Sequence, residues 1–288
     1  MLGRGYTRRV SATQIAQNLA YINWTVLAGL ALGAYGAVVL LRRRTAATRG
    51  YLGFVTACAI GFGILAWLSD GALPASLGTS PVVPDPAFDL PRRASLAIFS
   101  GAALLALVAN RGSAAGANGL EMVALGAGAA TVIFGAVGWG GGPVGAAALL
   151  VQLAVLFAAT GGVFAAMILG HWYLVTPRLP EAPLILLSRI LLGVMAIQVA
   201  LFVAWVALGA GPAAAGPFSA LTGPWALFVW LRLIVGLIFP LVVSWAAVQT
   251  ARTRSMESAT GLLYINVGTI AAGTILAAGL YFGAGLLV

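Results

Sequence analysis

Long apolar stretches dominate this sequence and constrain its fold more than any other feature. Of its 288 residues, 61% are hydrophobic and only 7% are charged, whereas soluble domains carry about 25% charged residues. The hydrophobic residues form runs of about 20, the length with which an α-helix crosses about 30 Å of hydrocarbon. Because lipid offers backbone amides no hydrogen-bond partner, such runs must be helical. The sequence therefore predicts an all-α, polytopic helical bundle that is integral to a membrane.

About eight such runs divide the chain, and we expect one transmembrane domain over residues 1–288. Residues 1–19 are polar and form an N-terminal or interfacial segment before the first run. Residues 70–91 contain five prolines, which favours an extended loop outside the membrane. The expected spans are residues 20–41, 50–69, 94–110, 120–139, 144–173, 183–208, 224–249 and 260–285.

Glycine and proline indicate how some of these helices bend and pack. The fifth run is long enough to need either tilt or a break, and Gly161-Gly162 is where we expect a break to lie. Pro240 should kink the seventh run, because proline removes a helical hydrogen bond. The small-residue spacing Gly29-x-x-x-Gly33 predicts a close helix–helix approach.

Arginine supplies all the positive charge, and its distribution predicts an orientation. The chain has 15 basic residues, none of them lysine, and a net charge of +9. Short cytoplasmic loops are rich in basic residues, so we expect the odd-numbered loops inside and both termini outside. The Ala, Gly and Arg bias is typical of a bacterial chain, hence of the bacterial cytoplasmic membrane. Dispersed arginines indicate contact with anionic lipids rather than nucleic acid. The basic residues of the odd loops are Arg42, Arg43, Arg44, Arg49, Arg111, Arg178, Arg252 and Arg254.

Arg232 is the most informative polar residue, because it lies about eight positions inside the seventh span. Ionisable side chains at membrane depth are costly and often mark function. Arg232 is therefore a candidate ligand for an anionic head group, a quinone carbonyl or a carboxylate such as Asp70. The alternative is an arginine that extends to the membrane surface, or a static ion pair with Asp70.

A second group of candidate residues lies near the cytoplasmic ends of the later spans. It comprises His171 and Tyr173 at the end of the fifth span, Arg189 in the sixth and Tyr264 in the eighth, with Glu257 nearby. Such side chains can hydrogen-bond the two carbonyls of a quinone and transfer its protons. The alternative is an interfacial belt of aromatic residues with a capping histidine and an exposed arginine.

The remaining polar residues restrict the chemistry that this chain can perform alone. Cys58 is its single cysteine and His171 its single histidine, so it holds neither a self-contained iron–sulfur cluster nor a bis-histidine haem. We expect no intrinsic cofactor or metal, although His171 could be one axial ligand of a haem or chlorin. Gln152, Gln198 and Asn266 are more typical of helix–helix hydrogen bonds than of a solute pathway. Familiar enzyme signatures are absent, so an enzyme acting by itself is not expected.

The last run, from Gly268 to Phe282, reads GTIAAGTILAAGLYF. With the eight-span topology, it resembles the haem-free membrane anchor subunits of dimethyl sulfoxide and polysulfide reductases. The resemblance implies quinol binding and electron transfer to a docked iron–sulfur subunit. Thr274 stands where that family would have an acidic residue, and Ala278 where arginine is common. The stretches Gly170–Pro177 and Ser258–Tyr264 also resemble a group of uncharacterised bacterial membrane proteins.

These observations lead to one hypothesis and two alternatives. The leading hypothesis is a membrane subunit of a respiratory or other electron-transfer complex that anchors membrane and peripheral redox subunits and interacts with quinone. One alternative is a transporter or channel for a small or neutral solute. The other is a haem- or pigment-binding subunit that uses His171.

Overall fold

The computed structural model describes residues 12–110, 114–176 and 179–288, and this part of the chain contains helices but no β-strand. Eight segments are long and apolar enough to cross a membrane. The predicted all-α bundle of about eight transmembrane helices is thus confirmed, and the chain is a multi-pass membrane protein. The helices are α1 (Ala12–Arg44), α2 (Arg49–Asp70), α3 (Asp89–Ala109), α4 (Ala114–Trp139), α5 (Pro143–Val175), α6 (Ala182–Leu208), α7 (Ala226–Leu233), α8 (Phe239–Arg252) and α9 (Met256–Ala284), with short elements η1 (Pro86–Phe88), η2 (Ser219–Leu221) and η3 (Ile234–Ile238).

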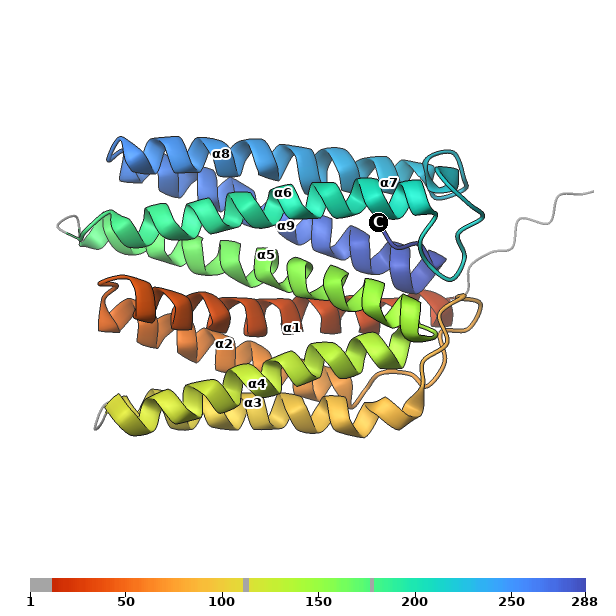
Figure 1. Ribbon diagram of the computed structural model, residues 1–288, viewed down its shortest axis with the longest axis horizontal. Helices are drawn as coiled ribbons and strands as arrows, with labels where there is room; N and C mark the ends of the chain where they lie inside the picture. The colour runs from red at the N-terminus through yellow and green to blue at the C-terminus, as the bar shows by residue number, and fades with distance from the viewer. Residues whose placement is uncertain (1–11, 111–113, 177–178) are drawn as a thin grey trace, which may run out of the picture.

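The helices run side by side, and successive spans alternate in direction (Figure 1). The link between α1 and α2 and the link between α8 and α9 share one end of the bundle, which we call the arginine-rich end (Figure 1). The proline-rich loop and Val288 lie at the opposite end. Of the expected polar segment, residues 1–11 lie outside the described residues, whereas residues 12–19 continue α1 as one helix.

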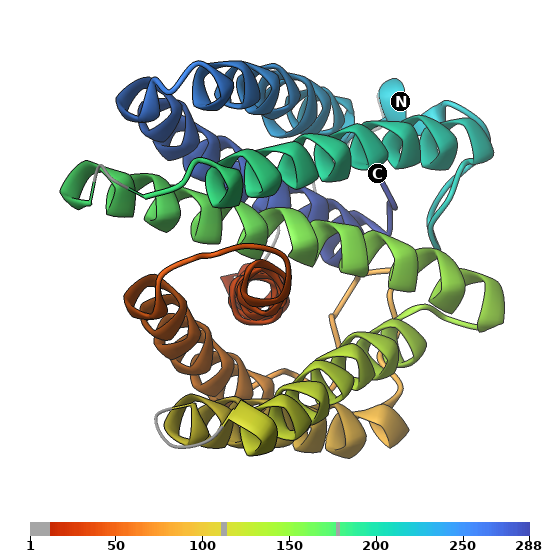
Figure 2. The ribbon, with the colours of Figure 1, turned by 60° about the vertical axis from the view of Figure 1, so that its left-hand side comes forward.

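The bundle consists of two halves that pack around α1. In the first half, α1 packs on α2, α2 on α3 and α3 on α4; in the second, α5, α6, α8 and α9 pack in the same cyclic order. Figure 2 shows α1 nearly end-on between the two groups. The halves meet chiefly where α1 contacts α5 and α9, and where α4 contacts α5.

The crossing of α1 and α5 explains the glycines of both helices. A Cβ atom on Gly33 would lie 1.9 Å from the carbonyl oxygen of Phe157, and one on Gly161 would lie 2.1 Å from the nitrogen of Ala34. The predicted close approach at Gly29 and Gly33 is therefore confirmed. The predicted break at Gly161 is wrong, because α5 is continuous from Pro143 to Val175. Glycine serves there to admit a neighbouring backbone rather than to interrupt the helix.

Two prolines shape local structure in different ways. Before Pro240, the expected disturbance takes the form of a five-residue π-helical segment, Ile234–Ile238, between α7 and α8.

The loop predicted over residues 70–91 is shorter than expected, since η1 begins at Pro86 and α3 at Asp89. The Asp85 side chain accepts a hydrogen bond from the Ala87 amide at 3.0 Å, and proline is compatible with the first turn of a helix.

Candidate functional site

His171 and Tyr264 meet at the arginine-rich end of the second half. The Tyr264 hydroxyl lies 3.2 Å from Nδ1 of His171, and both side chains are exposed. His171 comes from the last turns of α5 and Tyr264 from the early turns of α9. The two helices approach closely beside this pair, because a Cβ atom on Gly170 would lie 2.7 Å from Oγ1 of Thr260. The sequence placed both residues at this membrane depth, and the fold brings them into contact.

The other residues expected in this group have different surroundings. Tyr173 is buried, and its hydroxyl donates a hydrogen bond to the Pro180 carbonyl, which ties the end of α5 to the following loop. Arg189 is exposed on α6, a helix that packs against α5 and α8. Glu257 is exposed in the first turn of α9. Of this group, His171 and Tyr264 are the pair joined by a recorded contact among the described residues, and Tyr173 has a structural contact.

Arg232 lies in the interior of the second half with only 1% of its surface exposed. Its Nη2 donates to the side-chain oxygen of Gln198 at 2.5 Å, and its Nη1 donates to the carbonyl oxygen of Gly236 at 3.2 Å. The buried Nε has no hydrogen-bond partner among the described residues. This guanidinium does not extend to the membrane surface, contrary to one of the two expectations.

The local sequence explains how a helix accommodates this cation. Pro240 has no N–H, so it cannot donate to the carbonyl of Gly236 four residues earlier. That carbonyl instead accepts from Arg232. Gly236 also packs against Gly273 of α9, where a Cβ atom would lie 2.8 Å from both the Gly236 backbone and the Arg232 side chain. Two glycines and one proline thus create the space and the acceptor that the arginine uses.

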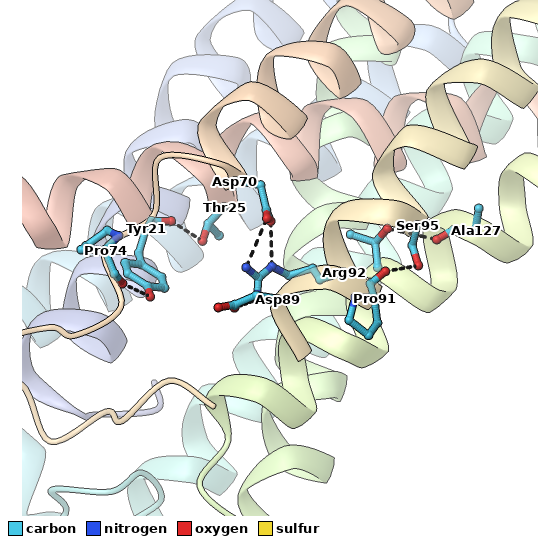
Figure 3. Close-up of polar contacts among 10 residues, drawn as sticks. Tyr21, Thr25, Asp70, Pro74, Asp89, Pro91, Arg92, Ser95 and Ala127 are labelled. Carbon is cyan, nitrogen blue, oxygen red and sulfur yellow. Dashed lines mark hydrogen bonds and ion pairs between the residues drawn. The ribbon is translucent and has the colours of Figure 1, made fainter. Parts of the chain in front are cut away.

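Asp70 does not pair with Arg232, which corrects that part of the expectation. Its carboxylate accepts two hydrogen bonds from Arg92, at 2.7 Å from Nε and 3.3 Å from Nη2, with both residues buried (Figure 3). Arg92 Nη1 also donates to Asp89 at 3.0 Å, and its guanidinium lies 4.6 Å from the Trp139 ring centroid. The expected third span began at residue 94 and so left Arg92 outside it; the Asp89-x-x-Arg92 spacing was the signal that could have placed Arg92 on a helix.

The three amides considered for a solute pathway occupy separate hydrogen-bonded contacts. Gln152 donates to the Val288 carbonyl at 3.3 Å and accepts from the Trp205 indole at 3.1 Å. Asn266 donates to the Ser244 hydroxyl at 2.7 Å, which joins α9 to α8. Gln198 is bonded to Arg232. All three amides are buried and join neighbouring segments.

An apolar groove of about 340 Å³ lies between the two halves. Residues of α1, α4, α5 and α6 line it, including Gly36, Gly128, Gly162 and Leu191. Its lining carries almost no polar surface, so it suits a hydrocarbon chain rather than a quinone head group. His171 lies about 13 Å farther along α5 than Gly162 and on the opposite face of that helix. The groove and the His171–Tyr264 pair are therefore separate features.

Comparisons with models of protein families, with curated proteins and with solved structures found no match. Within the described ranges, no group of three or more His, Cys, Asp or Glu residues is arranged to hold a metal ion. What the geometry establishes is the class of protein and the position of two polar sites, His171–Tyr264 and Arg232–Gln198. The chain is a multi-pass membrane protein, and the eight candidate spans in its described part form two packed halves.

Proposed function

We propose that this chain is the integral-membrane subunit of a respiratory or other electron-transfer complex, and that a quinone head group binds at His171 and Tyr264. The contact between these two side chains carries the proposal. Each can donate or accept a hydrogen bond, and histidine exchanges protons near neutral pH. Both side chains are exposed, so a quinone can reach them from the membrane without a channel through the bundle.

The chemistry divides between this chain and its partners. Oxidation of a quinol to a quinone releases two protons and two electrons. His171 and Tyr264 would accept hydrogen bonds from the quinol hydroxyls and pass the protons toward water. The electrons need an acceptor on another chain, because one cysteine and one histidine cannot hold an iron–sulfur cluster. A docked iron–sulfur subunit is the acceptor that this proposal requires.

Two measurements test the proposal at different levels. Purification from the native membrane in mild detergent, with mass spectrometry of each co-purifying chain, tests the complex, and stoichiometric redox subunits are the expected result. Quinone binding to His171→Gln and Tyr264→Phe variants tests the site, and we expect each to weaken binding about tenfold. Tyr281→Phe is the matched control, since it removes a hydroxyl from the same helix at the opposite end, where that hydroxyl bonds Trp139.

The outcomes separate the two levels. Co-purifying redox subunits with unchanged quinone binding in both variants would leave the complex and reject the site. A chain that purifies alone and without quinone would reject the complex. An absorption spectrum of the same preparation tests whether His171 ligates a haem or chlorin. The ligating atom would be Nε2, because the contact with Tyr264 uses Nδ1.

Transport of a small solute is the second candidate, and Arg232 is the observation that favours it. A buried cation in a transmembrane helix is typical of substrate pathways, and the adjacent π-helical segment is a common feature of functional helices. Flux of small neutral and anionic solutes into liposomes that contain only this chain tests this function. Flux that Arg232→Gln abolishes would support transport, whereas an electron-transfer subunit should show none.

The arginine-rich end supports a cytoplasmic orientation for that face of the bundle, with both termini outside. A cysteine at Thr45, between α1 and α2, would report this in a chain that also carries Cys58→Ala. A membrane-impermeant thiol reagent should label it only after the bacterial cells are opened. Labelling of intact cells would reverse the proposed orientation.

A further inference from the structure

A second groove, of about 960 Å³, lies at the arginine-rich end of the first half. Its polar lining comes from Arg42, Arg49 and Asn110, and its apolar lining includes Gly53, Phe54 and Leu107. Charged groups therefore stand at the membrane surface, and apolar groups line the part that continues toward the hydrocarbon. The quinone proposal uses none of these residues.

The sequence of α2 explains the space. Gly50, Gly53 and Ala57 recur at helical spacing on one face and present almost no side chain. A Cβ atom on Gly53 would lie 3.9 Å from the side chain of Leu107 of α3, an ordinary contact distance, so Leu107 stands directly opposite this glycine. Phe54 on the same face has 48% of its surface exposed and forms an apolar wall. These residues form the apolar part of the 960 Å³ groove beside α2 and α3.

The charges at the mouth favour an anion. Arg42 forms an ion pair with Glu121, a buried carboxylate of α4, which holds this guanidinium at the groove. Arg49 is exposed in the first turn of α2, where the helix dipole adds positive potential. Arg43 and Arg44 follow Arg42 at the end of α1, and neither lines the groove. Two arginines of the groove lining, Arg42 and Arg49, thus stand beside one carboxylate, and the excess charge is positive.

We propose that this groove binds an anionic phospholipid of the surrounding bilayer. Arg49 and Arg42 hold the phosphate through charge-assisted hydrogen bonds, and an acyl chain lies along the Gly50–Ala57 face of α2 against Leu107. A basic pocket between transmembrane helices, open to the acyl region, has the chemistry that recognises such lipids. The bound lipid occupies this groove.

Native mass spectrometry of the detergent-purified chain, exchanged into mixed phosphatidylglycerol and phosphatidylcholine, tests this site. We expect retention of one phosphatidylglycerol and about tenfold weaker retention in Arg49→Gln. Arg44→Gln is the matched control, since it removes the same charge at the same end of the bundle, from the last residue of α1 and outside the groove lining, and should retain the lipid. Equal losses in Arg44→Gln and Arg49→Gln, or equal retention of phosphatidylcholine, would overturn the proposal.

A second pair of variants tests the apolar part of the groove without changing charge. Gly53→Leu fills the groove and should reduce lipid retention, whereas Gly61→Leu lies two turns along α2, where no atom stands within 4 Å of the added Cβ. Soluble glycerol phosphate serves as the competitor. If it displaces the lipid fully and Gly53→Leu has no effect, the groove is a phosphate site and not a phospholipid site.

Discussion

Gln198 of α6 accepts a hydrogen bond from the guanidinium of Arg232 in α7, at 2.5 Å, with both side chains buried. No carboxylate among the described residues pairs with this arginine. A neutral amide and a backbone carbonyl therefore take the place that an acidic residue would usually fill. Burial of a cation with so little compensation is expensive.

The first prediction concerns this pair. Gln198→Leu should destabilise the protein by about 3 kcal/mol, because it leaves a buried guanidinium short of an acceptor. Arg232→Met should be close to neutral or stabilising, since it removes the charge and keeps an apolar chain of similar length. The double variant should therefore recover most of the loss. Thermal unfolding followed by tryptophan fluorescence in one detergent measures all three.

Gln249→Leu is the control for the amide change, because Gln249 is only half-buried near the end of α8. It should shift the unfolding temperature little. A loss of stability in Arg232→Met as large as that in Gln198→Leu would show that the cation itself holds the helices together.

The second prediction concerns the buried ion pair between Asp70 and Arg92, at the end of the bundle that carries the proline-rich loop. Asp70→Asn should cost about 3–5 kcal/mol, because it leaves the Arg92 guanidinium buried without its carboxylate. Asp89→Asn is the matched substitution, since Asp89 also bonds Arg92 but is half exposed. It should cost about 1 kcal/mol or less. Equal costs in the same thermal assay would contradict the assigned roles of the two carboxylates.

The third prediction concerns neighbouring glycines of α5. Gly161→Ala should destabilise the chain by about 1–3 kcal/mol or prevent folding, because its methyl group would overlap the backbone of α1. Gly162→Ala should be neutral or stabilising, since no atom lies within 4 Å of its Cβ position and alanine favours helix by about 1 kcal/mol. The yield of monodisperse protein in size-exclusion chromatography distinguishes the two. Equal behaviour would argue against the close α1–α5 crossing.

The fourth prediction concerns the stability of the two variants that test quinone binding. His171→Gln and Tyr264→Phe should each change the free energy of unfolding by no more than about 0.5 kcal/mol, because both side chains are exposed. Loss of quinone binding in these variants would then report on the site and not on folding. A large fall in unfolding temperature would instead identify the pair as a structural link between α5 and α9.

Local sequence determined the eight membrane-spanning segments found among the described residues. Runs of about 20 apolar residues in lipid have no alternative to helix, because each backbone amide needs an internal partner. The predicted spans consequently agree with the helices to within a few residues at most ends. The starts of α1, α3 and α4 are the main departures, since each helix begins earlier than expected. At α3, five prolines suggested a loop where Pro86 and Pro91 instead lie in the opening turns of helix.

Only the tertiary structure decided which polar groups meet. Arg232, Asp70 and Gln198 were all visible in the sequence, but their pairing depends on which faces of distant helices turn toward each other. Asp70 pairs with Arg92. Arg232 donates to Gln198 and to the Gly236 carbonyl, which receives no hydrogen bond from Pro240. Gly161 is another case that the sequence alone could not decide, because its local sequence is equally compatible with a helix break and with a helix crossing. Periodicity and hydrophobicity act locally, whereas contacts across a bundle arise from packing.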